Sequence, residues 1–158
     1  MAGIAHLGIG LAVKFLIPEV PVVILVICSY LIDLIFMVFM ILGLEDMPSS
    51  DHITETPWSH SLFMAIIWSI LTASVFMLIS HDSYTSMIIG LLVFSHWVID
   101  FIVSPMTYVF PNDTRKFLHP FGKSPKVGLG VMRSKAGVML IEGGFFLIGG
   151  SIFIFTLL

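Results

Sequence analysis

Long runs of apolar residues, separated by short polar segments, fill this chain from end to end. A membrane-spanning helix needs roughly 20 mostly apolar residues. Four runs reach that length, namely 21–44, 61–80, 84–110 and 136–158. A fifth run, 2–17, could be a full span, a tilted span or a half-span ended by Pro18. Because the runs are continuous rather than alternating, strands are disfavoured, and the pattern predicts an all-α integral membrane protein with about five transmembrane helices in a compact bundle.

Composition agrees with this pattern. The 158 residues are 58% hydrophobic and 11% charged, with a mean hydropathy of +1.07, whereas soluble domains carry about 25% charged residues. We expect one membrane-embedded domain, 1–158, without a separate soluble domain and without a cleavable signal peptide. The single cysteine, Cys28, excludes an intrachain disulfide, and the net charge of −3 gives no indication of a nucleic-acid partner.

The segment 111–135 is strongly basic. It carries six of the seven basic residues: Arg115, Lys116, Lys123, Lys126, Arg133 and Lys135. The positive-inside rule makes this loop cytoplasmic, and its alternative roles are to set topology or to attract anionic lipid headgroups. With five spans, the N-terminus and the polar segment 45–59 face the cytoplasm, while the C-terminus and the turn at 80–83 face the other side. The expected location is the cell (inner) membrane, in a multi-pass arrangement.

Ionisable side chains interrupt the apolar runs at one depth. On the five-span topology they all fall in the cytoplasmic half of the membrane, and they are His6, Asp33, His60, His96, Asp100 and Glu142. An ionisable group near the bilayer centre costs several kcal/mol, so such groups pair, bind a ligand or line a wet cavity. Because the residues are scattered along the sequence, their shared depth indicates one site.

Five of these residues suit a metal ion. His96 and Asp100 are four residues apart and share one helix face, and His6, Asp33 and His60 complete a nitrogen and oxygen ligand set. Such a set fits Zn²⁺ best, with Mn²⁺ or Fe²⁺ as alternatives, in a centre of one or two ions. Each histidine by itself could instead be a hydrogen-bond partner between helices.

A metal centre at this depth favours hydrolysis of a lipid or lipid-linked substrate that arrives from the cytoplasmic leaflet. The bond could be an ester, an amide or a phosphodiester. Asp33 or Glu142 is the candidate proton acceptor, and Ser61 is a candidate catalytic group that could equally be a helix cap. Two other functions remain open: an intramembrane protein that handles protons or metal ions, and a non-enzymatic membrane subunit. An oligomer is compatible with the sequence, which does not specify one.

The order of the motifs resembles the LexA-regulated, membrane-bound metal-dependent hydrolase family of bacteria and archaea. Members of that family carry an early "GH", then "PDxDH", "HRGxTHS", "SHxxxD" and "LWP". This chain has "AHLGIG" with His6, "YLID" with Asp33, "PWSHSLF" with His60, "SHWVIDFIVSP" with His96 and Asp100, and then "YVFP". The resemblance covers about residues 5–111.

The chain departs from the family pattern at two motifs. Only one aspartate of "PDxDH" is present, and Glu55, Thr56 and Pro57 stand where the family has "HRG". The resemblance implies metal-dependent hydrolysis, and the departures favour one metal held by His60, His96 and Asp100 with His6, Asp33 or both. Glu55 could be a further ligand.

Overall fold

A computed structural model describes residues 3–45, 57–103, 107–108, 126–129 and 135–158. Its elements, in chain order, are α1 (Gly3–Val13), α2 (Val22–Ser29), α3 (Leu31–Ile41), α4 (Pro57–His60), α5 (Leu62–Ser80), α6 (Ser83–Val103), β1 (Thr107–Tyr108), β2 (Lys126–Val127), α7 (Lys135–Val138), the π-helical turn η2 (Met139–Gly143) and α8 (Gly144–Thr156). Apart from the short β1–β2 pair, the regular secondary structure of the described residues is helical, which agrees with the predicted all-α class.

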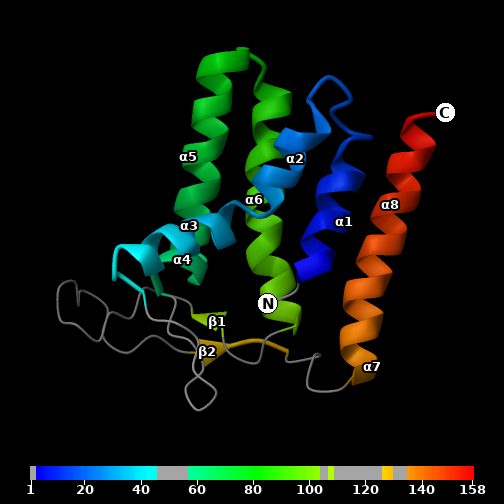
Figure 1. Ribbon diagram of the computed structural model, residues 1–158. Helices are drawn as coiled ribbons and strands as arrows, with labels where there is room; N and C mark the ends of the chain where they lie inside the picture. Colours follow the sequence, from blue (N-terminus) through cyan, green and yellow to red (C-terminus); the bar gives the residue numbers. More distant parts are fainter. Residues whose placement is uncertain (1–2, 46–56, 104–106, 109–125, 130–134) are drawn as a thin grey trace.

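The longer helices run side by side along one axis (Figure 1). The N-terminus, α7 and the β1–β2 pair lie at one end of the bundle, which we call the N-terminal end. The turn between α5 and α6 and the C-terminus lie at the opposite end. The start of α1 and the end of α8 therefore lie at opposite ends of the bundle.

Three helical segments among the described residues are long and apolar enough to cross a membrane: Leu62–Ser80, Ser83–Val103 and Met139–Thr156. The pair α2 and α3 adds a fourth if it counts as one span, and α1 is a shorter apolar helix. The helices are therefore compatible with a membrane location. The expected turn at 80–83 is confirmed, because α5 ends at Ser80 and α6 begins at Ser83.

Two helix predictions were wrong in their extent. The run 21–44 was expected to be one helix with Asp33 at its middle, but the chain bends by 57° between α2 and α3, so Asp33 lies in the first turn of α3. The run 84–110 was expected to be helical throughout, but α6 ends at Val103. Pro105 follows shortly after, and proline disfavours helix at the residue before it.

Part of the run 84–110 and of the basic loop is a small sheet. Thr107 and Tyr108 pair antiparallel with Val127 and Lys126, respectively. The rest of the predicted loop, 111–125 and 130–134, lies outside the described residues, as does Glu55.

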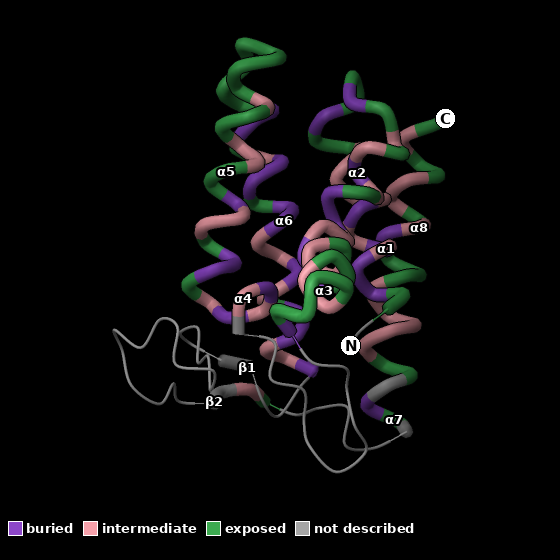
Figure 2. Tube along the Cα trace, turned by 60° about the vertical axis from the view of Figure 1, so that its left-hand side comes forward, coloured by how far each residue is buried: buried purple, intermediate pink, exposed green. Residues whose placement is uncertain are grey.

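The core lies where α1, α2, α3, α5 and α6 meet around buried side chains such as Leu25, Ile32, Ala65, Ile89 and Val93. Helix α6 contributes more of it than any other helix and is buried at intervals along its length, whereas α5 and α8 are largely exposed (Figure 2). Apolar side chains on those exposed faces suit contact with lipid, because the interior of a bilayer is as apolar as they are.

Helices α1 and α8 approach each other through glycines. A Cβ atom added at Gly149 would overlap the Gly8 carbonyl group and lie 2.8 Å from the Gly8 Cα. A Cβ added at Gly8 would in turn overlap the backbone of Phe145. Since glycine permits such close backbone packing, these two positions fix α8 against the helix that carries His6.

Candidate metal centre

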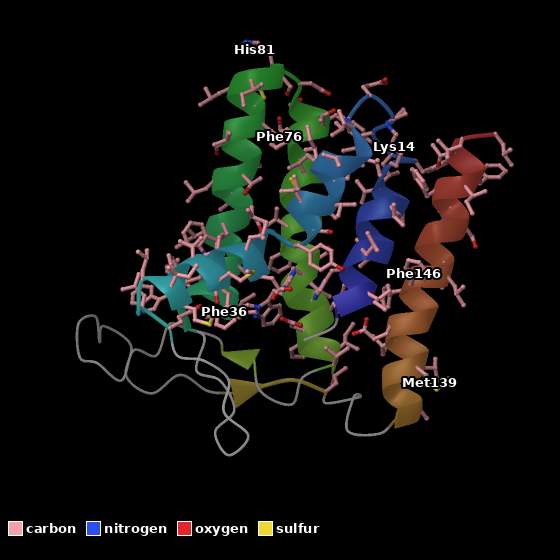
Figure 3. The ribbon with its side chains drawn as sticks, viewed as in Figure 1. Lys14, Phe36, Phe76, His81, Met139 and Phe146 are labelled. Carbon is pink, nitrogen blue, oxygen red and sulfur yellow. The ribbon has the colours of Figure 1, made fainter. Side chains whose placement is uncertain are left out.

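Five polar side chains from four helices meet towards the N-terminal end of the bundle. His6 comes from α1, Asp33 from α3, His60 from the last position of α4, and both His96 and Asp100 from α6. His6, His96 and Asp100 are buried, whereas Asp33 and His60 are partly buried. Phe36, which is labelled in Figure 3, marks the place of the cluster, because its ring lies edge-on to the His60 ring with centroids 5.8 Å apart. The structure thus brings together all five residues that the sequence predicts as metal ligands.

The atoms of the cluster lie within a small volume. His60 Nε2 is 3.3 Å from Asp33 Oδ1 and 3.6 Å from Asp100 Oδ2. His96 Nε2 is 3.6 Å from each of the same two oxygens. His6 Nε2 is 3.8 Å from Asp100 Oδ1, and the His6 ring stacks on the His96 ring with centroids 3.8 Å apart.

Two overlapping triads have potential ligand atoms within 4.8 Å of one another. One is His6, His96 and Asp100, and the other is Asp33, His60 and His96. Three protein ligands are the usual number at a catalytic zinc site, where a further position stays open.

The bend between α2 and α3 has a direct role in forming the cluster. It lies at Tyr30, whose hydroxyl donates to the carbonyl of Gly3 at the start of α1. The carbonyl of Ser29, just before the bend, accepts a hydrogen bond of 2.9 Å from His96 Nδ1. The bend therefore places the Ser29 carbonyl where it orients His96, and it places the carboxylate of Asp33, three residues after Tyr30, in the cluster.

The hydrogen bond to Ser29 determines the proton position on His96. A carbonyl oxygen can only accept, so His96 Nδ1 carries the hydrogen. In the neutral ring, Nε2 then carries a lone pair, and this atom faces the carboxylates of Asp33 and Asp100. Metal-bound histidines usually have this arrangement, with one nitrogen on the ion and the other donating to a carbonyl or carboxylate.

His60 is held by a second network that reaches to Glu45, at the end of the segment that follows α3. Its Nδ1 is 2.6 Å from Ser59 Oγ, which donates to Glu45 Oε2 at 2.8 Å. Glu45 Oε1 also accepts from the backbone N–H groups of Trp58 and Ser59, at 2.8 Å each. Burial raises the pKa of the Glu45 carboxyl above its ordinary value, and the hydrogen bonds from Ser59 and Trp58 oppose that shift by favouring the ionised form.

Several atoms of the cluster have no hydrogen-bond partner among the described residues. They are His6 Nδ1, His6 Nε2, His96 Nε2 and Asp100 Oδ1. Buried polar atoms in proteins are nearly always satisfied, so this group of atoms calls for a bound species. A divalent cation answers most of these requirements, because it accepts one lone pair from each imidazole and offsets two carboxylate charges in an apolar setting. The residues present therefore fit a metal ion.

The two remaining sequence-predicted site residues are engaged elsewhere. Ser61 is the N-cap of α5, where its Oγ accepts from the Met64 N–H at 3.3 Å. Glu142 lies in η2, and its Oε2 accepts from the N–H groups of Ile4 and Ala5 at 2.6 and 2.9 Å. Glu142 thus holds the first turn of the helix that carries His6.

Sequence reasoning missed Glu45, Ser59 and the Ser29 carbonyl as partners of the cluster. The only local signal for these contacts is that Ser59 and His60 are neighbours in the sequence. Glu45 is 14 residues from Ser59 in the sequence, beyond any helical spacing, so no periodic pattern could connect the two.

Comparisons with protein-family models, with curated proteins and with solved structures found no match. The resemblance to the LexA-regulated hydrolase family therefore stays a prediction. The arguments for function come from the site itself, as they must when fold alone says little about activity.

Proposed function

We propose that this chain is a membrane-embedded, metal-dependent hydrolase that cleaves an ester, amide or phosphodiester bond in a lipid or lipid-linked molecule. The observation that carries the proposal is the convergence of three imidazoles and two carboxylates from four helices, in which His96 Nε2 and both nitrogens of His6 find no hydrogen-bond partner in the described part of the chain. The proposed ligands are His6, Asp33, His60, His96 and Asp100.

Zn²⁺ is the ion that we propose first, because nitrogen and oxygen donors at three protein positions are the usual zinc set. Mn²⁺ and Fe²⁺ accept the same donors. A bound ion of this kind polarises a carbonyl or phosphoryl oxygen and makes a water molecule acidic enough to be deprotonated near neutral pH.

The chain's own residues divide the remaining tasks. Hydrolysis adds the hydroxyl of water to the acyl or phosphoryl group and the other proton of water to the departing oxygen or nitrogen. In a centre where the other four residues hold the ion, we propose that Asp33 accepts the water proton, because its side chain is 19% exposed, against 9% for Asp100, and a proton must pass to or from the outside. Asp100 lies within 4 Å of all three imidazoles and serves as the structural carboxylate.

A lipid-like substrate is supported by the surroundings of the cluster. Helix α3, which carries Asp33, has exposed apolar side chains such as Leu34, Met37, Val38 and Ile41. A substrate with an acyl or prenyl chain would keep that chain in contact with such residues while its polar group reaches the metal. On the positive-inside rule, we place this end of the bundle on the cytoplasmic side of a cell membrane.

The proposal is tested by a hydrolysis screen on detergent-purified protein. Chromogenic esters, amides and phosphodiesters with long acyl chains are offered with zinc or with a chelator. We expect turnover of one bond class, lost with chelator and in Asp100→Asn, and retained in His81→Ala, whose histidine lies at the opposite end of the bundle (Figure 3). Equal turnover in wild type and Asp100→Asn would refute the proposal.

A further inference from the structure

Glu45 and Ser59 form a continuous hydrogen-bonded path to His60. Glu45 is only 3% exposed and Ser59 is fully buried, so water does not compete for either partner. The serine hydroxyl has one hydrogen, and Glu45 Oε2 receives it. Towards His60, Ser59 Oγ can then only accept, so His60 Nδ1 must donate.

That donation decides which nitrogen of His60 is free for a ligand. With the hydrogen on Nδ1, the neutral ring presents the Nε2 lone pair, and Nε2 is the atom that faces Asp33 and Asp100. A lone pair facing two carboxylates is unfavourable unless a cation lies between them. The path from Glu45 therefore prepares His60 for a metal ion, as the Ser29 carbonyl prepares His96.

We propose that Glu45 and Ser59 are positioning residues that keep the His60 hydrogen on Nδ1 and thereby present Nε2 to the metal. The inference rests on the metal centre of the proposed function. It does not depend on which bond the protein cleaves. Outer partners of metal-bound histidines typically change metal affinity by about 10- to 100-fold when they are removed.

A purely structural role for Glu45 is the rival explanation. Its two bonds to the backbone of Trp58 and Ser59 also hold α4 in place. Ser59→Ala separates the two roles, because it removes the link to His60 and keeps both backbone bonds. Glu45→Gln tests the direction of the hydrogen bonds. The amide NH₂ in place of Oε2 donates to Ser59 Oγ, so the serine hydrogen turns towards His60 Nδ1. His60 Nδ1 must then accept, which favours the tautomer with the hydrogen on Nε2.

The test measures zinc affinity by competition with a chromophoric chelator in detergent. We expect Ser59→Ala and Glu45→Gln to bind zinc about 10- to 100-fold more weakly than wild type, and Ser59→Thr, which keeps the hydroxyl, to recover most of the affinity. Ser69→Ala is the matched control, because Ser69 is a buried serine whose hydroxyl donates to the Ala65 carbonyl of its own helix. It should bind zinc as wild type does.

A second readout does not require any variant of Glu45 or Ser59 to fold. In zinc-loaded wild type labelled with ¹⁵N-histidine, the His60 signals, assigned by their loss in His60→Ala, should show a hydrogen on Nδ1 and the metal on Nε2. A hydrogen on Nε2, or unchanged affinity in Ser59→Ala, would overturn the positioning role alone. Failure of wild type to bind zinc, manganese or iron would overturn the metal centre and this inference with it.

Discussion

The contact between α1 and α8 provides a sharp test of the packing. Gly149 and Gly150 are adjacent in α8, yet a Cβ at Gly149 would overlap the backbone of Gly8, while a Cβ at Gly150 would have no neighbour within 4 Å among the described residues. Carbon atoms pack at roughly 3.5–4.0 Å, whereas the Cβ at Gly149 would lie 2.8 Å from the Gly8 Cα. Since the Gly8 carbonyl atoms would lie closer still, the Gly149→Ala change requires the two helices to separate by at least about 1 Å.

The comparison of Gly149→Ala with Gly150→Ala isolates this overlap. Both changes add the same helix propensity, about 1 kcal/mol in favour of alanine, so that contribution cancels between them. Overpacking of a close contact costs about 1–3 kcal/mol. We expect Gly149→Ala to be less stable than Gly150→Ala by that amount.

The assay is unfolding in mixed micelles with increasing SDS, followed by far-UV circular dichroism. Wild type and Gly150→Ala should unfold at similar SDS fractions, with Gly150→Ala slightly more resistant, and Gly149→Ala should unfold earlier. Equal stability of the two alanine variants would refute the close approach of α8 to α1.

Three other predictions follow from single contacts. Replacing Glu142 with Gln removes the negative charge that accepts hydrogen bonds from two N–H groups in the first turn of α1. We expect the free energy of unfolding in the same SDS assay to fall by about 1–2 kcal/mol, with unchanged metal content. Loss of metal without loss of stability would contradict this. Leu92→Ala should lower the free energy of unfolding by about 2–5 kcal/mol because Leu92 is 2% exposed, whereas Leu91→Ala should leave it nearly unchanged because Leu91 is 56% exposed. Similar losses in the two variants would contradict the orientation of α6. Hydrogen bonds, chiefly with the Thr85 side chain, hold the pKa of Asp82 below its ordinary value of 3.8, so the ionised carboxylate stabilises the fold above that value and the stabilisation is lost as pH falls through the lower folded pKa. The melting-temperature difference between wild type and Asp82→Ala should therefore shrink below about pH 4. A difference that stays constant with pH would exclude this linkage.

The helical class and the five candidate ligands could be predicted because each rests on a strong local rule. Apolar runs of spanning length predict helices, and ionisable residues inside such runs must be satisfied together. Ionisable residues at one membrane depth can be grouped because the cost of burying a charge does not depend on where the residue stands in the sequence. Their shared depth therefore groups His6 with Asp100, although the two residues are far apart along the chain.

The bend at Tyr30 could not be predicted by the same rules. Residues 22–41 contain neither proline nor glycine, which are the residues that usually kink helices. Here the bend is stabilised by distant partners, namely the Gly3 carbonyl for Tyr30 and His96 for the Ser29 carbonyl. Tertiary contacts of this kind leave no periodic signal in the local sequence, and the same is true of Glu45.

The central claim is that these side chains bind a metal ion, and elemental analysis of detergent-purified protein tests it most directly. Wild type and His81→Ala, which leaves the cluster intact, should each contain at least one zinc, manganese or iron ion per chain. The double variant His60→Ala/His96→Ala should contain none while remaining folded. Folded wild type without stoichiometric metal, after purification with added zinc and without chelators, would contradict the account.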